Sequence, residues 1–149
     1  MDGVQEISGI TTRLRAADSL PDTLVAGFGA FEAIRQLARG CEDKVPALFA
    51  AFMTTADAAV DGRQAITIAP SLPPDRPSGA GVSMPQTSVP VEEIASALAG
   101  LGELLRDRLS RAAAIAATAA DRAACTQAAQ AAGRIRQLMT RADDDACPW

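Results

Sequence analysis

Residues 91–142 read VEEIASALAGLGELLRDRLSRAAAIAATAADRAACTQAAQAAGRIRQLMTRA and are the strongest indication of fold class in the sequence. No proline interrupts it, and alanine supplies about a third of its residues. Alanine has the highest intrinsic helix propensity of the amino acids and proline has the lowest. The segment is therefore predicted to be helical along almost its whole length.

Two stripes of apolar side chains run along this segment, and they point in different directions. The first stripe is Ile94, Leu98, Leu101, Leu105 and Leu109, and the second is Ala124, Ala128, Ala131, Ile135 and Leu138. On one ideal helix the second stripe is rotated from the first by roughly a quarter turn. Either the chain turns back near Ala117–Arg122, or a single helix continues and its uncovered half forms a dimer interface. The local residues include no glycine, proline or asparagine to favour a turn, so both alternatives stay open.

Residues 66–90 have the opposite composition, because they hold six of the nine prolines. Proline removes a backbone donor and restricts the residue before it to extended conformations. This proline-rich segment is predicted to be a long loop or linker. At about 3.1 Å per residue it is long enough to cross a small bundle from end to end.

Residues before this loop show helical periodicity in three further segments. Ser19 precedes Pro21, a favoured first-turn residue, whereas Gly40 and Gly62 are predicted to follow helix ends. The prediction is an all-α fold, an antiparallel helical bundle of four to five helices with a long proline-rich loop. Helices are expected over 3–17, 21–39, 44–61, 91–118 and 121–141, the last two separate or continuous, in one domain over 1–142 with an acidic tail at 143–149.

Composition limits the classes of function. The net charge of −4 argues against binding to nucleic acid, and no apolar helical run is long enough to span a membrane. The three cysteines form no spaced pairs, and the first residues do not resemble a signal peptide. The strong preference for arginine over lysine is typical of a GC-rich bacterial genome. A cytoplasmic bacterial protein is expected.

The chain lacks histidine, the commonest general base and a common metal ligand. Neither a catalytic residue, a metal site nor a cofactor is therefore expected, and an enzyme is not the preferred interpretation. The acidic pairs Glu103 with Asp107 and Asp57 with Asp61 are one helical turn apart, and we expect them to form surface ion pairs with arginines.

The preferred function is therefore a non-enzymatic helical interaction or scaffold protein. It is expected to self-associate, or to bind another helical protein, through the alanine-rich C-terminal segment in the manner of a coiled coil. If that segment is one helix, Arg108, Arg111, Arg122 and Arg136 share a face that could contact nucleic acid or an acidic partner, although a solvated polar face is the preferred interpretation. The alternative is a small-ligand-binding regulatory bundle with a pocket lined by Phe28, Phe31, Phe49 and Phe52.

Overall fold

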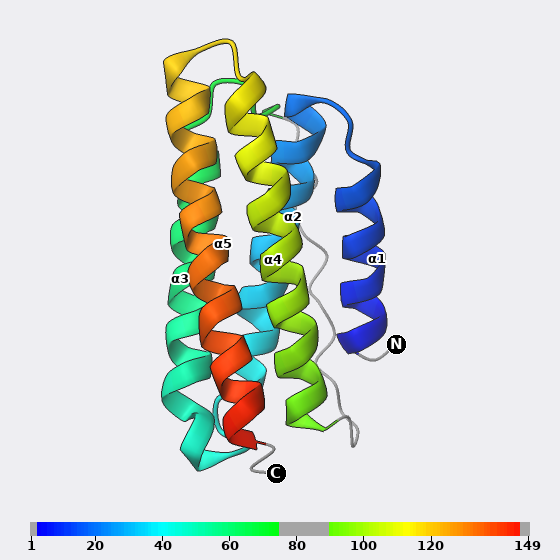
Figure 1. Cartoon of the computed structure of the whole chain (residues 1–149), viewed down its shortest axis with the longest axis vertical. Helices are drawn as coiled ribbons and strands as arrows, with labels where there is room; N and C mark the ends of the chain where they lie inside the picture. The colour runs from blue at the N-terminus through cyan, green and yellow to red at the C-terminus, as the bar shows by residue number, and fades with distance from the viewer. Residues whose placement is uncertain (1–2, 75–89, 147–149) are drawn as a thin grey trace.

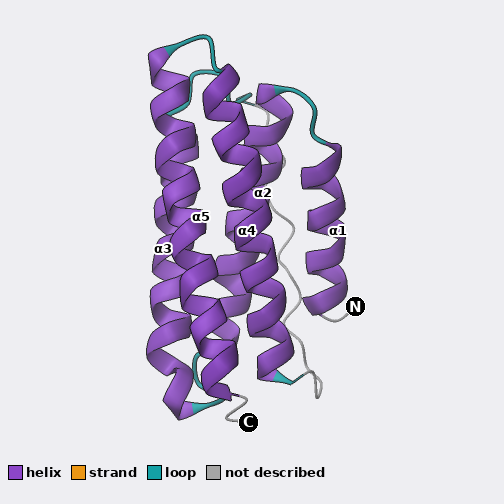
Figure 2. Ribbon diagram, in the orientation of Figure 1, coloured by secondary structure: helices purple, strands orange, loops and turns teal. Residues whose placement is uncertain are grey.

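The computed structural model describes residues 3–74 and 90–146, and every regular element in these ranges is a helix. The elements are α1 (Gly3–Ala16), α2 (Leu20–Cys41), the short 3-10 helix η1 (Pro46–Leu48), α3 (Phe49–Thr67), α4 (Val91–Ile115) and α5 (Ala119–Ala146). Figure 2 shows these helices packed side by side, with short turns at the ends of the bundle. The predicted all-α helical bundle is confirmed.

Four of the helices form the bundle itself, and α1 lies outside it. Packing contacts join α2 to α3, α3 to α5, α5 to α4 and α4 to α2, so the four helices close a ring. Figure 1 shows that each neighbouring pair is antiparallel, whereas α3 and α4 run in the same direction. Helix α3 therefore ends at the opposite end of the bundle from the start of α4, an arrangement typical of bundles with one long crossover. Helix α1 packs against α2 and α4.

The alanine-rich segment is a helical hairpin, which settles the alternatives left by the sequence in favour of a turn. Helix α4 ends at Ile115, and Ala116 adopts an extended conformation with φ −64° and ψ 131°. Thr118 then caps α5, because its Oγ1 accepts a hydrogen bond from Asp121 N at 3.1 Å and its carbonyl accepts one from Arg122 N at 3.1 Å. A threonine hydroxyl is a favoured helix N-cap. The turn therefore depends on Thr118 rather than on glycine or proline.

Both predicted stripes face the same core because the hairpin folds the second stripe back beside the first. Ile94, Leu98, Leu105 and Leu109 of α4 are fully buried, as are Ala124, Ala128 and Ile135 of α5. The difference in direction between the stripes thus reflects the reversal of the chain.

Several predicted helix ends are wrong. Helix α3 begins at Phe49 and continues to Thr67, so Gly62 lies inside it and the first two residues of the predicted loop are helical. Helix α2 continues past Gly40 to Cys41. The predicted acidic tail is helical as far as Ala146. Helices α2 and α3 extend because tertiary packing overrides the local helix-ending preference of Gly40 and Gly62.

Two further predictions concern the segments before α2 and after α3. Ser19, rather than Leu20, is the N-cap of α2, because its Oγ accepts a hydrogen bond from Asp22 N at 3.2 Å. Most of the predicted proline-rich loop, residues 75–89, lies outside the described residues. Within 3–74 and 90–146, no helix combines the length and the apolar content that crossing a membrane requires.

Candidate functional site

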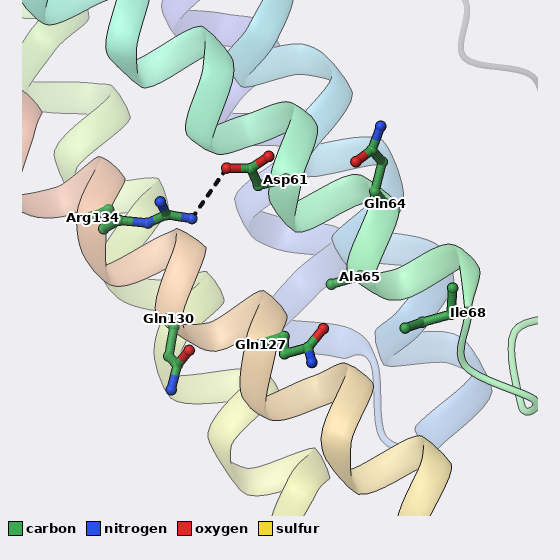
Figure 3. Close-up of a pocket in the computed structure, with 7 residues that line it drawn as sticks. All are labelled: Asp61, Gln64, Ala65, Ile68, Gln127, Gln130 and Arg134. Carbon is green, nitrogen blue, oxygen red and sulfur yellow. Dashed lines mark hydrogen bonds and ion pairs between the residues drawn. The ribbon is translucent and has the colours of Figure 1, made fainter.

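A groove of about 410 Å³ follows the seam between α3 and α5. Because these helices are antiparallel, residues 61–68, at the end of α3 and directly after it, lie opposite residues 134–127 of α5. The residues that line the groove are Asp61, Gln64, Ala65, Ile68, Gln127, Gln130 and Arg134. Figure 3 shows them arranged along the two facing helices, with charged side chains toward one end and Ile68 toward the other.

The charged end of the α3–α5 groove is an ion pair between the two helices. Arg134 Nη2 lies 3.4 Å from Asp61 Oδ2, and the two side chains are 55% and 57% exposed. A strong charge-assisted hydrogen bond is shorter, at about 2.7–2.9 Å. The two charges are therefore held beside each other, but both stay open to solvent and to further partners.

The rest of the α3–α5 groove is uncharged. Three glutamines line it, and their carboxamides make no hydrogen bond to any residue in the part of the chain that the structure describes. Ala65 is buried, whereas the Ile68 side chain is 64% exposed. In Figure 3 the carboxamide of Gln127 extends toward the part of the groove near Ile68. This part offers both hydrogen-bonding groups and apolar surface.

A second hollow, of about 310 Å³, lies between α4 and α5 on the outside of the hairpin. Its lining consists mainly of short side chains: Arg106, Ser110, Ala113, Thr126, Ala129, Gln130 and Gly133. The missing side chain at Gly133 contributes to the hollow, since a Cβ there would stand 3.4 Å from Arg106 Cδ. This surface belongs to the alanine-rich segment that the sequence singles out for interaction.

The four phenylalanines differ in exposure. Phe31 and Phe52 are fully buried in the core, Phe28 is partly buried against it, and Phe49 is 41% exposed. None of them lines either of the two hollows. Neither hollow therefore corresponds to the predicted Phe-lined pocket, which stays a prediction.

The four arginines of the predicted interaction face lie on two helices, because the continuous helix on which that face depended is interrupted at Ala116. Arg108 Nη2 donates to Arg15 O of α1 at 3.2 Å, and Arg122 Nη2 donates to Ala116 O at 3.3 Å. Arg111 and Arg136 form ion pairs with Asp107 and Glu103, respectively. All four arginines thus have intramolecular partners.

The expected surface pairing of the acidic residues with arginines is confirmed. Asp57 lies 3.9 Å from Arg39, and Asp61 pairs with Arg134. Asp107 pairs with Arg111 at 3.4 Å, and Glu103 pairs with Arg106 at 2.8 Å as well as with Arg136 at 2.5 Å. Asp57, Asp61 and Glu103 therefore help to join neighbouring helices, whereas Asp107 pairs within α4.

The two thiols in the described residues, Cys41 and Cys125, are free and fully buried. Burial raises the pKa of each thiol, and the nearby carboxylate of Asp121 adds to the increase in the pKa of Cys125. A thiol with a raised pKa is a poor nucleophile at neutral pH because little thiolate is present. Within residues 3–74 and 90–146, no group of three or more acidic or cysteine side chains is placed to hold a metal ion.

Sequence reasoning missed the α3–α5 groove. It considered Asp61 only as a surface acid, and it did not single out Gln127, Gln130 or Arg134. The spacing of these three residues places them on one face of α5, but only the antiparallel pairing with α3 brings that face beside Gln64 and Asp61. Finding the groove therefore required the register between two helices that are far apart in the sequence.

No protein-family model matches the chain. No curated protein and no solved structure is significantly similar to it. Its function therefore has to be inferred from the arrangement of its own residues.

Proposed function

We propose that this protein is a non-enzymatic helical interaction protein that self-associates through the outer face of its α4–α5 hairpin. The observation that carries the proposal is the hollow between the two helices, with its lining of Ser110, Ala113, Ala129 and Gly133. The distance between packed helices depends on the side chains at the contact, and small side chains allow the closest approach. A helix of a second copy can therefore approach the hairpin closely at these small residues.

The charges beside the hollow favour a second copy of the chain over an unrelated partner. Helix α4 carries Glu103, Arg106, Asp107 and Arg111 within three turns, and their side chains are at least 45% exposed. Two copies related by a two-fold axis present the same surface to each other. A face with alternating charges can then place the acids of one copy near the arginines of the other.

The available side chains support a non-enzymatic role. The chain has no histidine, and both described thiols are buried. Four acidic side chains pair with arginines: Asp57, Asp61, Glu103 and Asp107. Such pairs stabilise helix packing and leave no poised general base. If one of these carboxylates left its arginine and acted as a general base, the protein would turn over a substrate, and an activity assay would detect it.

Oligomeric state tests the proposal directly. We expect size-exclusion chromatography with light scattering to show a dimer at tens of micromolar, and the Ser110→Glu, Thr126→Glu double variant to be a monomer. Both positions are exposed, so the substitutions should leave the fold intact. Thr54→Glu, on the exposed face of α3, is the matched control and should stay dimeric. A monomeric wild-type protein, or a double variant that still dimerises, would overturn the proposal.

A cytoplasmic location in a bacterium forms part of the same proposal. Its support is the arginine-rich composition and the free state of the two described thiols, which suits a reducing compartment. Fractionation of cells that express the tagged protein tests the location.

A further inference from the structure

We propose that the groove between α3 and α5 is a binding site for a free α-amino acid with an uncharged side chain. This site lies mainly on the α3 side of α5, whereas the proposed dimer face lies mainly on the α4 side, and Gln130 borders both. The inference goes beyond self-association and does not depend on it.

The ion pair at one end of the groove matches the two charges of an amino acid. The ammonium and carboxylate groups of an α-amino acid are bonded to the same carbon, so they are about as far apart as Asp61 and Arg134. Those residues hold opposite charges 3.4 Å apart across the seam. A zwitterion can lie antiparallel to this pair, with its ammonium on the Asp61 carboxylate and its carboxylate on the Arg134 guanidinium.

Both protein groups have unused hydrogen-bonding capacity for such a ligand. A guanidinium has five N–H donors in a planar fork that suits a carboxylate, and a carboxylate can accept several hydrogen bonds. The contact between Arg134 and Asp61 uses one nitrogen and one oxygen. An exposed ion pair contributes little to stability, so its rearrangement around a ligand costs little.

The remaining part of the groove determines which side chains fit. Gln127 extends its carboxamide toward the part of the groove near Ile68, and Ala65 and Ile68 offer apolar surface. Among the described residues, Asp61 and Arg134 are the charged members of the lining, and they already face the ammonium and carboxylate of the ligand, so the lining offers no further counter-charge to a charged ligand side chain. Polar uncharged and aliphatic side chains are therefore favoured. The volume of about 410 Å³ is within the range of small-molecule sites.

Titration followed by NMR tests this site. Uniformly 15N-labelled protein is titrated with L-glutamine and L-leucine, and with N-acetyl-leucine and leucinamide, which lack one charge each. We expect the free amino acids to shift the side-chain amide signals of Gln127, and each analogue to bind at least about tenfold more weakly. Equal binding of an analogue would overturn the proposal, as would the absence of saturable shifts with both free amino acids.

Variants separate this site from general surface binding. Asp61→Asn and Arg134→Gln should each abolish saturable shifts, whereas Arg141→Gln, an exposed arginine further along α5, should bind as the wild type does. Thermal melting checks that each variant is folded. The Ser110→Glu, Thr126→Glu variant should also bind normally, so a failure of dimerisation and a failure of ligand binding are separate results. Retained binding in both groove variants would contradict the assignment.

Discussion

The carboxylate of Asp121 accepts two hydrogen bonds from Ser71, one from the backbone N at 3.0 Å and one from Oγ at 2.6 Å. Asp121 is in the first turn of α5, and Ser71 belongs to the segment that follows α3. The Asp121 side chain is only 2% exposed. These two bonds fasten the end of α3 to the α4–α5 turn.

Replacing Asp121 with alanine should destabilise the protein by about 1–3 kcal/mol, because the Ser71 donors lose their acceptor in a part-buried site. The favourable position of an acid at the N-terminus of α5 is lost as well. Urea denaturation followed by circular dichroism measures the change in the free energy of unfolding. Asp107→Ala removes an acid from an exposed ion pair and should cost at most about 0.5 kcal/mol. Equal costs for the two variants would show that the contact with Ser71 contributes nothing.

Stability should fall in acid because of Glu32. This carboxylate of α2 accepts from Arg35 Nη2 at 2.6 Å and from Gln36 Nε2 at 3.2 Å, and it pairs with Arg63 of α3. The hydrogen bond from Arg35 and the further bonds from Arg63 and Gln36 lower the pKa of Glu32 from 4.5 to about 2.

Because the pKa of Glu32 is lower in the folded than in the unfolded protein, its contribution is complete above pH 4.5 and is lost as the pH falls toward 2. The contribution is roughly 3 kcal/mol at most, since each unit of pKa shift corresponds to about 1.4 kcal/mol. We expect the free energy of unfolding of Glu32→Gln to depend less on pH than that of the wild type between pH 5 and 2. Parallel profiles from denaturation at several pH values would rule out this role of Glu32.

The ring of Phe31 occupies the place where a side chain at position 62 would stand. A Cβ on Gly62 would lie 2.8 Å from Phe31 Cδ1 and closer still to two other ring atoms. Gly62→Ala should therefore destabilise the bundle by about 1–3 kcal/mol through overpacking between α2 and α3. Thermal or chemical denaturation measures the loss.

Gly100→Ala is the matched control for Gly62→Ala, because no heavy atom lies within 4 Å of a Cβ at that helical position. It should stabilise the protein by about 0.5–1 kcal/mol through the better helix propensity of alanine. Phe31→Leu should recover part of the loss in Gly62→Ala, and the double-mutant cycle gives the coupling energy. Additive effects would mean that the two residues do not compete for space.

The helical class and the core stripes could be predicted from the sequence, because periodicity along one helix reports its buried face. Leu98, Leu105 and Ile135 are buried as that pattern requires. The turn between α4 and α5 could not be predicted as clearly, because the residue that caps α5 is a single threonine, Thr118, among alanines that favour a continuous helix. Gly62 was misread for a related reason. A glycine in a helix serves either to end it or to admit a neighbour, and only the position of the Phe31 ring distinguishes the two.

The candidate groove could not be predicted from the sequence because it lies between two helices rather than on one of them. Asp61 and Arg134 are far apart in the chain, and their pairing depends on how α3 and α5 are aligned. The predicted arginine face shows the opposite case, in which residues expected to lie together are separated in the structure. The spacing of Arg108 and Arg136 would place them together only on an unbroken helix, and the hairpin gives each of them a separate partner.

Close packing of the hairpin at Gly102 leads to the last prediction. A Cβ on Gly102 of α4 would lie 3.0 Å from both Ala132 O and Arg136 N of α5. These are backbone atoms of a regular helix, so they cannot rotate away as a flexible side chain would. Gly102→Ala must then move the two helices apart, and its cost should lie in the upper part of the range of about 1–3 kcal/mol for overpacked sites.

Gly133→Ala tests the same helix pair from the other side. In the monomeric Ser110→Glu, Thr126→Glu background, its added Cβ would meet only Arg106 Cδ at 3.4 Å, the flexible part of a long side chain, so stability should be unchanged or slightly higher. Chemical denaturation of both variants gives the comparison. A neutral Gly102→Ala would show that α4 and α5 are not held at the close separation that this glycine permits. If Gly133→Ala is as costly as Gly102→Ala, the backbone contact at Gly102 is not the cause of the loss.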